Sequence, residues 1–187
     1  MHNKCQTRIQ KHIQLVHQQK DEINKKSIIF SNYFLNCTKR NKKIFIAGNG
    51  GSASDAQHLN TELQIRYKKK RRPFPSIALT ADTALITACS NDLSFDQIFS
   101  RQIESLGKKG DIFLGISTSG NSKNIVEAFR LAKKRGLFTL GILGNKGGLC
   151  KQYCKNTFIV DSSQTSLVQE LHLIFYHQIC ENLEALY

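Results

Sequence analysis

Residues 44–63, IFIAGNGGSASDAQHLNTEL, contain the stretch that decides the fold. The stretch begins as an apolar run of strand type, passes through a loop of Gly, Asn and Ser at 48–52, and continues as a helix-type segment. A buried strand that turns through glycines into a helix is the first part of a βαβ unit. The stretch therefore predicts an α/β fold.

The same alternation of strand-type and helix-type segments continues to the end of the chain. Strand-type runs occupy residues 43–47, 76–80, 112–117, 139–143 and 157–160. Helix-type segments lie at about 53–65, 82–90, 95–106, 122–135, 147–153 and 164–185. Strands this apolar are buried on both faces, so we expect a doubly wound, mostly parallel five-stranded sheet with helices on both faces. The 187 residues form one domain, spanning 1–187.

The segment before the first strand predicts a long N-terminal helix. Between residues 4 and 36 the apolar positions recur at roughly helical spacing. The pattern fits one long helix or two helices with a break near Asn24 to Lys26. Its first half has few apolar residues, so we expect segment 1–37 to contact other subunits of an oligomer.

Composition limits the class of protein. Apolar residues make up 40% of the chain and charged residues 22%, as in ordinary globular proteins. No run approaches the roughly 20 apolar residues of a membrane span, and the polar N-terminus lacks a signal-type apolar region. We therefore expect a cytoplasmic protein that does not bind membranes. The six cysteines are irregularly spaced, which favours reduced, packed thiols.

The formal net charge of +13 raises the question of nucleic-acid binding. Part of the excess lies in the basic run 68–72, KKKRR. No aromatic residues interleave with this run, and no nucleic-acid module surrounds it. The pattern favours a solvated loop or a guide for anionic small molecules, with nucleic-acid binding as the weaker alternative.

Two strand-to-helix loops have the composition of phosphate sites. One is loop 48–52, GNGGS, and the other is loop 117–122, STSGNS. Glycines allow the backbone N–H groups to turn inward, hydroxyls add donors, and the next helix presents its positive end. Gly48, Gly50 and Ala53 also fit a dinucleotide fingerprint, but the first acid after the next strand, Asp82, comes too late.

Two polar pairs at helical spacing suggest a catalytic or metal site. His58 and Glu62 are four residues apart, directly after the first loop. Gln169 and His177 are eight apart on the otherwise apolar last helix, with His172 between them as a bystander or a supporting group. Such groups would satisfy one another around a divalent ion, for which zinc is suited. A plain hydrogen-bonded pair of His58 and Glu62 remains the alternative.

Several motifs together resemble a known family. These are GNGGSASDAQH at 48–58, RPFPSIALTADT at 72–83, SND at 90–92, GISTSGNS at 115–122 and QELH…H at 169–177. They resemble, in register from about residue 40 to 185, the sedoheptulose-7-phosphate isomerases. These enzymes, also called phosphoheptose isomerases of GmhA type, belong to the SIS domain family. The resemblance implies a SIS fold, one Zn²⁺ per subunit, and a homotetramer with active sites between subunits.

The resemblance also implies a reaction and a role for each site residue. The enzyme would convert D-sedoheptulose 7-phosphate to D-glycero-D-manno-heptose 7-phosphate through an enediol, with Glu62 and His177 as the acid–base pair. The metal ligands would be His58, Glu62, Gln169 and His177. The substrate would contact Asn49, Gly50, Gly51, Glu62, Asn91, Asp92, Ser117, Thr118, Ser119, Ser122 and Gln169.

Some points stay open at this level. Ser166 stands where some family members have an acid, three residues before the glutamine. A non-catalytic relative of the same fold binds the replication initiator DnaA, but it lacks the glutamate and the last histidine that this chain has as Glu62 and His177. A sugar-phosphate-binding regulator without turnover is a further alternative. The product would feed lipopolysaccharide, capsule or another surface glycan, and the sequence does not choose among them.

Overall fold

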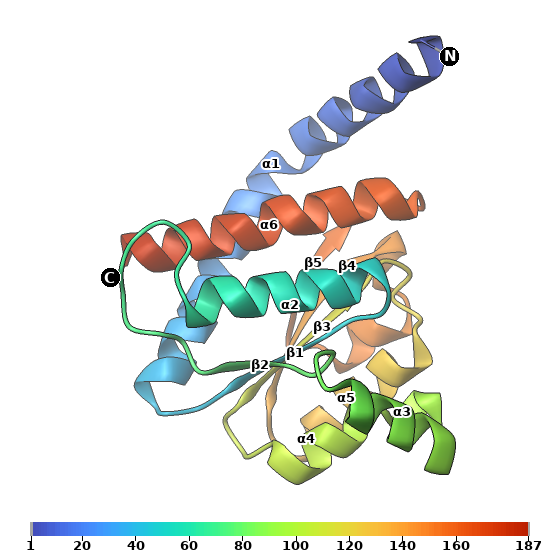
Figure 1. The fold of residues 1–187 in the computed structure, drawn as a ribbon. Coiled ribbons are helices and arrows are strands. Elements are labelled where there is room, and N and C mark those ends of the chain that lie inside the picture. Colours follow the sequence, from blue (N-terminus) through green and yellow to red (C-terminus); the bar gives the residue numbers. More distant parts are fainter. Residues whose placement is uncertain (1, 187) are drawn as a thin grey trace.

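The fold is built on one parallel sheet, seen in a computed structural model that describes residues 2–186 (Figure 1). The strands are β1 (Ile44–Ala47), β2 (Ser76–Ala78), β3 (Ile112–Ser117), β4 (Phe138–Gly144) and β5 (Asn156–Val160). Their order in the sheet is β2-β1-β3-β4-β5, and every neighbouring pair is parallel. The predicted five-stranded, doubly wound α/β sheet is confirmed.

The helices follow the predicted segments with one exception. They are α1 (His2–Lys39), α2 (Gly51–Gln64), α3 (Thr83–Asp92), α4 (Ser100–Leu106), α5 (Lys123–Lys134) and α6 (Thr165–Ala185), with short 3-10 turns η1 (Phe95–Gln97), η2 (Asn145–Gly147) and η3 (Leu149–Tyr153). The predicted single helix 95–106 is wrong, because the structure divides it into η1 and α4. The Ser100 hydroxyl donates to the Gln97 carbonyl at 3.2 Å, a local bond that competes with a continuous helix.

The two faces of the sheet are covered by different helices. Alternate side chains of a strand point to opposite faces. Ile44 and Ile46 pack with buried residues of α1, α2 and α6 on one face. Phe45 and Ala47 pack with buried residues of α4 and α5 on the other. Because α2 and α6 share one face, they lie side by side above the sheet (Figure 1).

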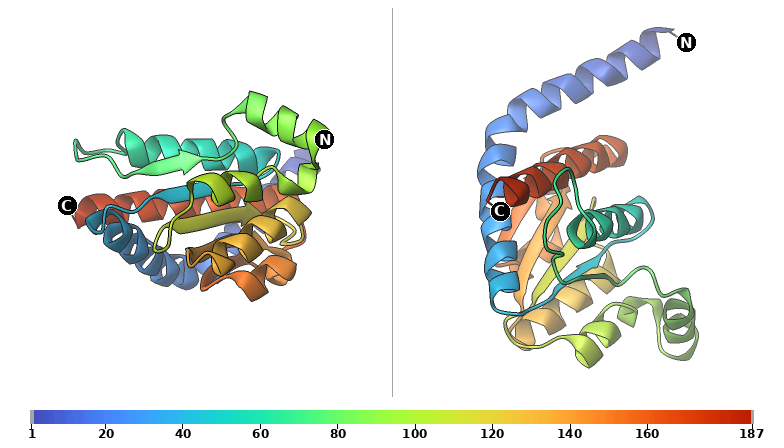
Figure 2. Two further views of the ribbon diagram at one scale, coloured as in Figure 1. Left: turned by 90° about the horizontal axis from the view of Figure 1, so that it is seen from below. Right: turned by 60° about the vertical axis from the view of Figure 1, so that its left-hand side comes forward.

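The N-terminal helix α1 is one continuous helix, so the two-helix alternative is excluded. Its second half packs against α6, and its first half projects away from the body of the molecule (Figure 2). Ile9 and Ile13 on the projecting part are 61% and 57% exposed. Arg8 and His12 bind the Glu170 carboxylate of α6 at 2.5 and 2.8 Å. None of the described helices has the length and apolarity needed to cross a bilayer.

Candidate active site

The two predicted phosphate loops lie beside each other at the carboxyl edge of the sheet. They follow β1 and β3, which are paired in register from Ile44↔Ile112 to Ala47↔Gly115. Asn49 of the first loop and Asn124 of α5 exchange two amide hydrogen bonds, at 2.8 and 2.9 Å. This pair ties the first loop to the start of α5. Asn124 was not predicted from the sequence, although an amide in the first turn after a hydroxyl-rich loop was a usable signal.

The hydroxyls of loop 117–122 converge at the N-terminus of α5. The Ser117 hydroxyl lies 3.5 Å from that of Ser119 and 3.2 Å from that of Ser122. The Gly120 N–H donates to Ser117 Oγ at 3.1 Å, and Gly120 has a φ of 67°, which favours glycine. Thr118 follows Ser117 and is half-buried. Hydroxyls and a helix N-terminus at one point form an anion site.

Loop 48–52 brings the start of α2 against α6. Gly50 has a φ of 54°, which allows the sharp entry into the helix. A Cβ added at Gly51 would lie 2.2 Å from Gln169 Nε2, so glycine leaves room for this placement of the Gln169 side chain. The two helices run in the same direction (Figure 1), and the close approach to Gly51 places Gln169 beside the loop.

Three of the four predicted metal ligands meet between α2 and α6. His58 Nε2 is 3.2 Å from Glu62 Oε1, and the rings of His58 and His177 are 5.1 Å apart between centroids. Gln169 is eight residues before His177, about 12 Å of helix rise away. Among the residues that the structure describes, no three His, Cys, Asp or Glu side chains are arranged as metal ligands.

Two residues that sequence analysis missed lie directly behind His58. The buried Tyr176 hydroxyl is 3.0 Å from His58 Nδ1 and 3.4 Å from Asp55 Oδ1. Asp55 precedes His58 by one helical turn, and Tyr176 is the neighbour of His177. The signal was therefore helical spacing, but no local pattern showed that α2 and α6 would meet.

Burial sets the charge state of several groups near the site. Burial, reinforced by the proximity of His58, lowers the pKa of His177. Burial raises the pKa of Asp55 to about 6. Burial lowers the pKa of His172 to about 4, and the Leu143 backbone offsets this effect only in part. His172 is therefore a neutral core residue.

The far ends of α2 and α6 are joined by a buried ion pair. The Glu184 carboxylate accepts N–H bonds from Tyr67, Lys68 and Lys69 at 2.9 to 3.0 Å. Arg71 Nε lies 3.6 Å from Glu184, and the two side chains are only 2% and 4% exposed. Arg71 also donates to the Glu62 and Leu63 carbonyls at the end of α2, at 2.5 and 2.9 Å. The prediction of a solvated loop at 68–72 is therefore wrong for Arg71, while the other four residues of the run are exposed.

Asn91 and Asp92 lie away from this cluster. They end α3, on the other side of the sheet from α6 (Figure 1). Asn91 Nδ2 donates to Asp92 Oδ1 at 2.8 Å, and both residues are exposed. Within one chain the structure does not bring them to the α2–α6 group. Ser166 is exposed in the first turn of α6.

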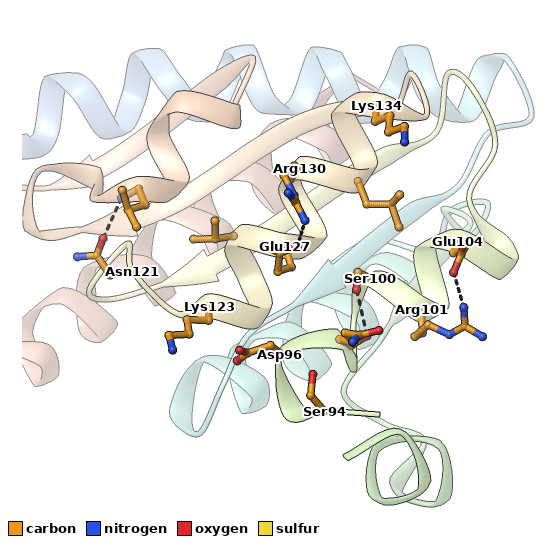
Figure 3. A pocket seen from close by; sticks show the side chains of 14 residues that line it. Ser94, Asp96, Ser100, Arg101, Glu104, Asn121, Lys123, Glu127, Arg130 and Lys134 are labelled. Carbon is orange, nitrogen blue, oxygen red and sulfur yellow. Dashed lines mark hydrogen bonds and ion pairs between the residues drawn. The ribbon is translucent and has the colours of Figure 1, made fainter. Parts of the chain in front are cut away.

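A cavity of about 820 Å³ lies between α5 and the η1–α4 segment (Figure 3). None of the predicted site residues lines it. Its charges are largely paired on its own walls, with Arg101 2.6 Å from Glu104 and Arg130 2.5 Å from Glu127. The cavity is therefore separate from the candidate active site, although Asn121 and Lys123 connect its rim to the second loop.

Comparisons with known proteins point to one family. Residues 6–144 match the SIS domain. The phosphoheptose isomerase of Campylobacter concisus is 51% identical over 146 residues, covering 78% of this chain and 77% of that protein. The phosphoheptose isomerase of Nitratiruptor sp. is 49% identical over 146 residues, covering 78% of each. The solved structure of phosphoheptose isomerase GmhA from Neisseria gonorrhoeae superimposes with a TM-score of 0.92 at 31% identity, covering 98% of each chain.

Proposed function

This chain belongs to the SIS domain family, among the phosphoheptose isomerases, and we propose that it is an isomerase that converts D-sedoheptulose 7-phosphate to D-glycero-D-manno-heptose 7-phosphate. The observation that carries this proposal is the meeting of Glu62 with His58 and His177 between α6 and α2, the helix that begins at loop 48–52. A carboxylate and a neutral imidazole are the groups that an aldose–ketose isomerisation needs. The DnaA-binding alternative is not favoured, since Glu62 and His177 are both present and lie together.

The loops account for substrate binding in this proposal. Ser117, Thr118, Ser119 and Ser122 would hold the phosphate at the α5 N-terminus, where their hydroxyls converge. Asn49, Gly50, Gly51 and Gln169 would contact the sugar from the adjoining loop and α6. Asn91 and Asp92 would contact substrate from a neighbouring subunit, because in one chain they lie on the other face of the sheet.

The acid–base chemistry falls to Glu62 and His177. Glu62 would take the proton from C1, which forms the enediol, and return it at C2. His177 would relay the proton between the two oxygens. Burial, with His58 nearby, lowers the pKa of His177 and so favours its neutral imidazole form. Glu62 faces His58 through Oε1, and Oε2 accepts no hydrogen bond from the described residues, so Oε2 is available as the base.

We propose that the same group binds one zinc ion per subunit. The donor types suit zinc, because two imidazoles and a carboxylate lie in one cluster and Gln169 lies on the same helix as His177, although these side chains are not arranged as ligands within the described chain. The ligands would be His58, Glu62, Gln169 and His177. A bound divalent ion supplies Lewis acidity that polarises the sugar carbonyl.

Assembly and location complete the proposal. The exposed Ile9 and Ile13 on the projecting half of α1 favour contacts with other copies, and we propose a homotetramer with intersubunit active sites. We also propose a cytoplasmic enzyme at the first step of nucleotide-activated heptose synthesis, upstream of lipopolysaccharide or capsule. A guide role for the exposed lysines toward the anionic substrate is consistent with the net charge of +13.

The test is direct conversion. Purified protein is incubated with sedoheptulose 7-phosphate, and the aldose is followed by NMR with a chelator and with added zinc. We expect aldose to form, more slowly with the chelator and at full rate after zinc is restored. Folded protein that binds the ketose phosphate but yields no aldose under either condition would contradict the proposal.

A further inference from the structure

A chain of three polar side chains runs behind the candidate active site, through the interface of α2 and α6. Asp55 and Tyr176 are buried, and Tyr176 is fully enclosed. The Tyr176 hydroxyl lies between Asp55 Oδ1 at 3.4 Å and His58 Nδ1 at 3.0 Å. The rings of His58 and Tyr176 meet edge to face at 5.5 Å. The hydroxyl therefore has two fixed neighbours but can donate a hydrogen bond to only one of them.

The direction of these hydrogen bonds follows from what each group can donate. An ionised carboxylate can only accept hydrogen bonds, so the Tyr176 hydroxyl donates its hydrogen bond to Asp55. The Tyr176 oxygen is then an acceptor toward His58, and His58 Nδ1 must carry the ring proton. In a neutral imidazole the other nitrogen, Nε2, then has a free lone pair.

The free lone pair of His58 faces another acceptor. Nε2 is 3.2 Å from Glu62 Oε1. Two acceptors facing each other at this distance are unfavourable unless a cation or a proton lies between them. Tyr176 and Asp55 thus leave the Nε2 lone pair of His58 free to bind a cation.

We propose that Tyr176 and Asp55 are positioning residues that fix His58 in its Nδ1–H tautomer and so make Nε2 a ligand for a divalent cation. The inference deepens the proposed function and rests on it, because His58 acts there as a metal ligand. Groups that donate to or accept from the far nitrogen of a metal-bound histidine typically change metal affinity 10- to 100-fold. Neither Tyr176 nor Asp55 touches substrate in this role.

The tautomer is tested on the metal-free full-length protein. The six histidines are labelled with ¹⁵N, and ring-nitrogen shifts are read by solid-state NMR at pH 8, where Asp55 is ionised. His58→Gln identifies the signals of His58. We expect Nδ1 protonated and Nε2 unprotonated in the wild type. A wild-type His58 with the proton on Nε2 would overturn the proposal.

Two variants should each move the ring proton of His58 to Nε2, for different reasons. Tyr176→Phe removes the acceptor, so the best remaining bond of His58 is Nε2–H to Glu62, and the tautomer should reverse. Asp55→Leu removes the acceptor for the hydroxyl, which can then turn and donate to Nδ1, again placing the ring proton on Nε2. For both we expect zinc affinity, titrated by calorimetry with Zn²⁺ alone, to fall about 10- to 100-fold.

The controls separate this role from general packing and from the proposed function. Tyr33→Phe removes a hydroxyl from a partly buried tyrosine of α1 and should change neither readout. Asp55→Asn keeps an acceptor oxygen and should keep the Nδ1–H tautomer. Unchanged tautomer and zinc affinity in Tyr176→Phe would overturn the proposal. Neither measurement needs substrate, so a protein without isomerase activity but with these results would contradict only the proposed function.

Discussion

Two glutamates on the neighbouring helices α2 and α6 show opposite designs. Glu184 is 4% exposed in its side chain, and its carboxylate is saturated by three backbone N–H donors and the nearby Arg71. Glu62 is 19% exposed, and its side-chain neighbour among the described residues is His58 Nε2 at 3.2 Å. Burial alone would raise the pKa of Glu184, but its hydrogen bonds and Arg71 hold the pKa below its usual value. A saturated carboxylate holds structure together, whereas one with unused lone pairs is free for chemistry.

The largest expected effect concerns Glu62, the carboxylate with unused lone pairs. Glu62→Gln keeps the shape of the side chain and removes the proposed base, so we expect turnover to fall by about 10²- to 10⁴-fold. Binding of inorganic phosphate, measured by calorimetry, should stay close to the wild-type value because the loop hydroxyls are untouched. The matched control is Glu181→Gln on α6, an exposed carboxylate paired with Lys68. Equal turnover in wild type and Glu62→Gln would remove Glu62 from the mechanism.

Glu184, whose carboxylate is fully hydrogen-bonded, should instead matter for stability. Glu184→Ala leaves Arg71 buried without its counter-ion and three N–H groups without an acceptor. We expect the free energy of unfolding to fall by about 3–5 kcal/mol, measured by urea denaturation. Glu62→Gln should change it by less than about 1 kcal/mol. If Glu62→Gln destabilised the protein as much as Glu184→Ala, the distinction between the two carboxylates would fail.

A third expectation concerns His172, which is fully buried in the core. Its pKa is about 4 in the folded protein against an ordinary 6.5, so the unfolded chain takes up a proton first as pH falls. The stability that the neutral ring contributes is present above pH 6.5 and is lost toward pH 4, by about 2 kcal/mol between pH 7 and pH 5. Asp55 has the opposite effect on stability. Because its pKa is raised to about 6, its contribution to the free energy of unfolding increases as the pH falls through the same range.

The effect of His172 is therefore measured as a difference. Urea denaturation of wild type and His172→Leu is compared at pH 7 and pH 5. His172→Leu cannot take up a proton, so its free energy of unfolding relative to the wild type should rise by about 2 kcal/mol on acidification. Parallel profiles for the two proteins would show that His172 is not held neutral by burial.

The sheet and the loops are predictable from the sequence because their signals are local. The apolar run before Gly48 and the hydroxyls after β3 are each readable within ten residues. The boundary near Ser100 was missed because residues 95–106 contain no Gly or Pro that would mark a break. Tyr176 and Asp55 were missed for a different reason, since their contact joins residues 121 positions apart. Zinc and the roles of Glu62 and His177 stay predictions, because the structure supplies proximity and not chemistry.

The smallest expected effect concerns the basic run 68–72, in which five adjacent cations divide by burial. Arg71 is enclosed and binds the end of α2, and Lys68 pairs with Glu181 and lies over the Tyr67 ring at 5.1 Å. The side chains of Lys69, Lys70 and Arg72 are exposed and form no hydrogen bond or ion pair with the described part of the chain. Replacing these three by glutamine should change the free energy of unfolding by no more than about 0.5 kcal/mol.

The same triple variant tests the remaining role for this run. A site for nucleic acid would retain a short DNA duplex at moderate salt, with binding that falls steeply as salt rises. We expect no retention by the wild type, because these cations lie on one loop without the aromatic residues that stack on bases. Arg71→Gln should be far more destabilising than the triple variant, since it leaves Glu184 buried without its counter-ion. A duplex retained by the wild type and released by the triple variant would instead make the exposed part of the run a binding surface, and only Arg71 a structural residue.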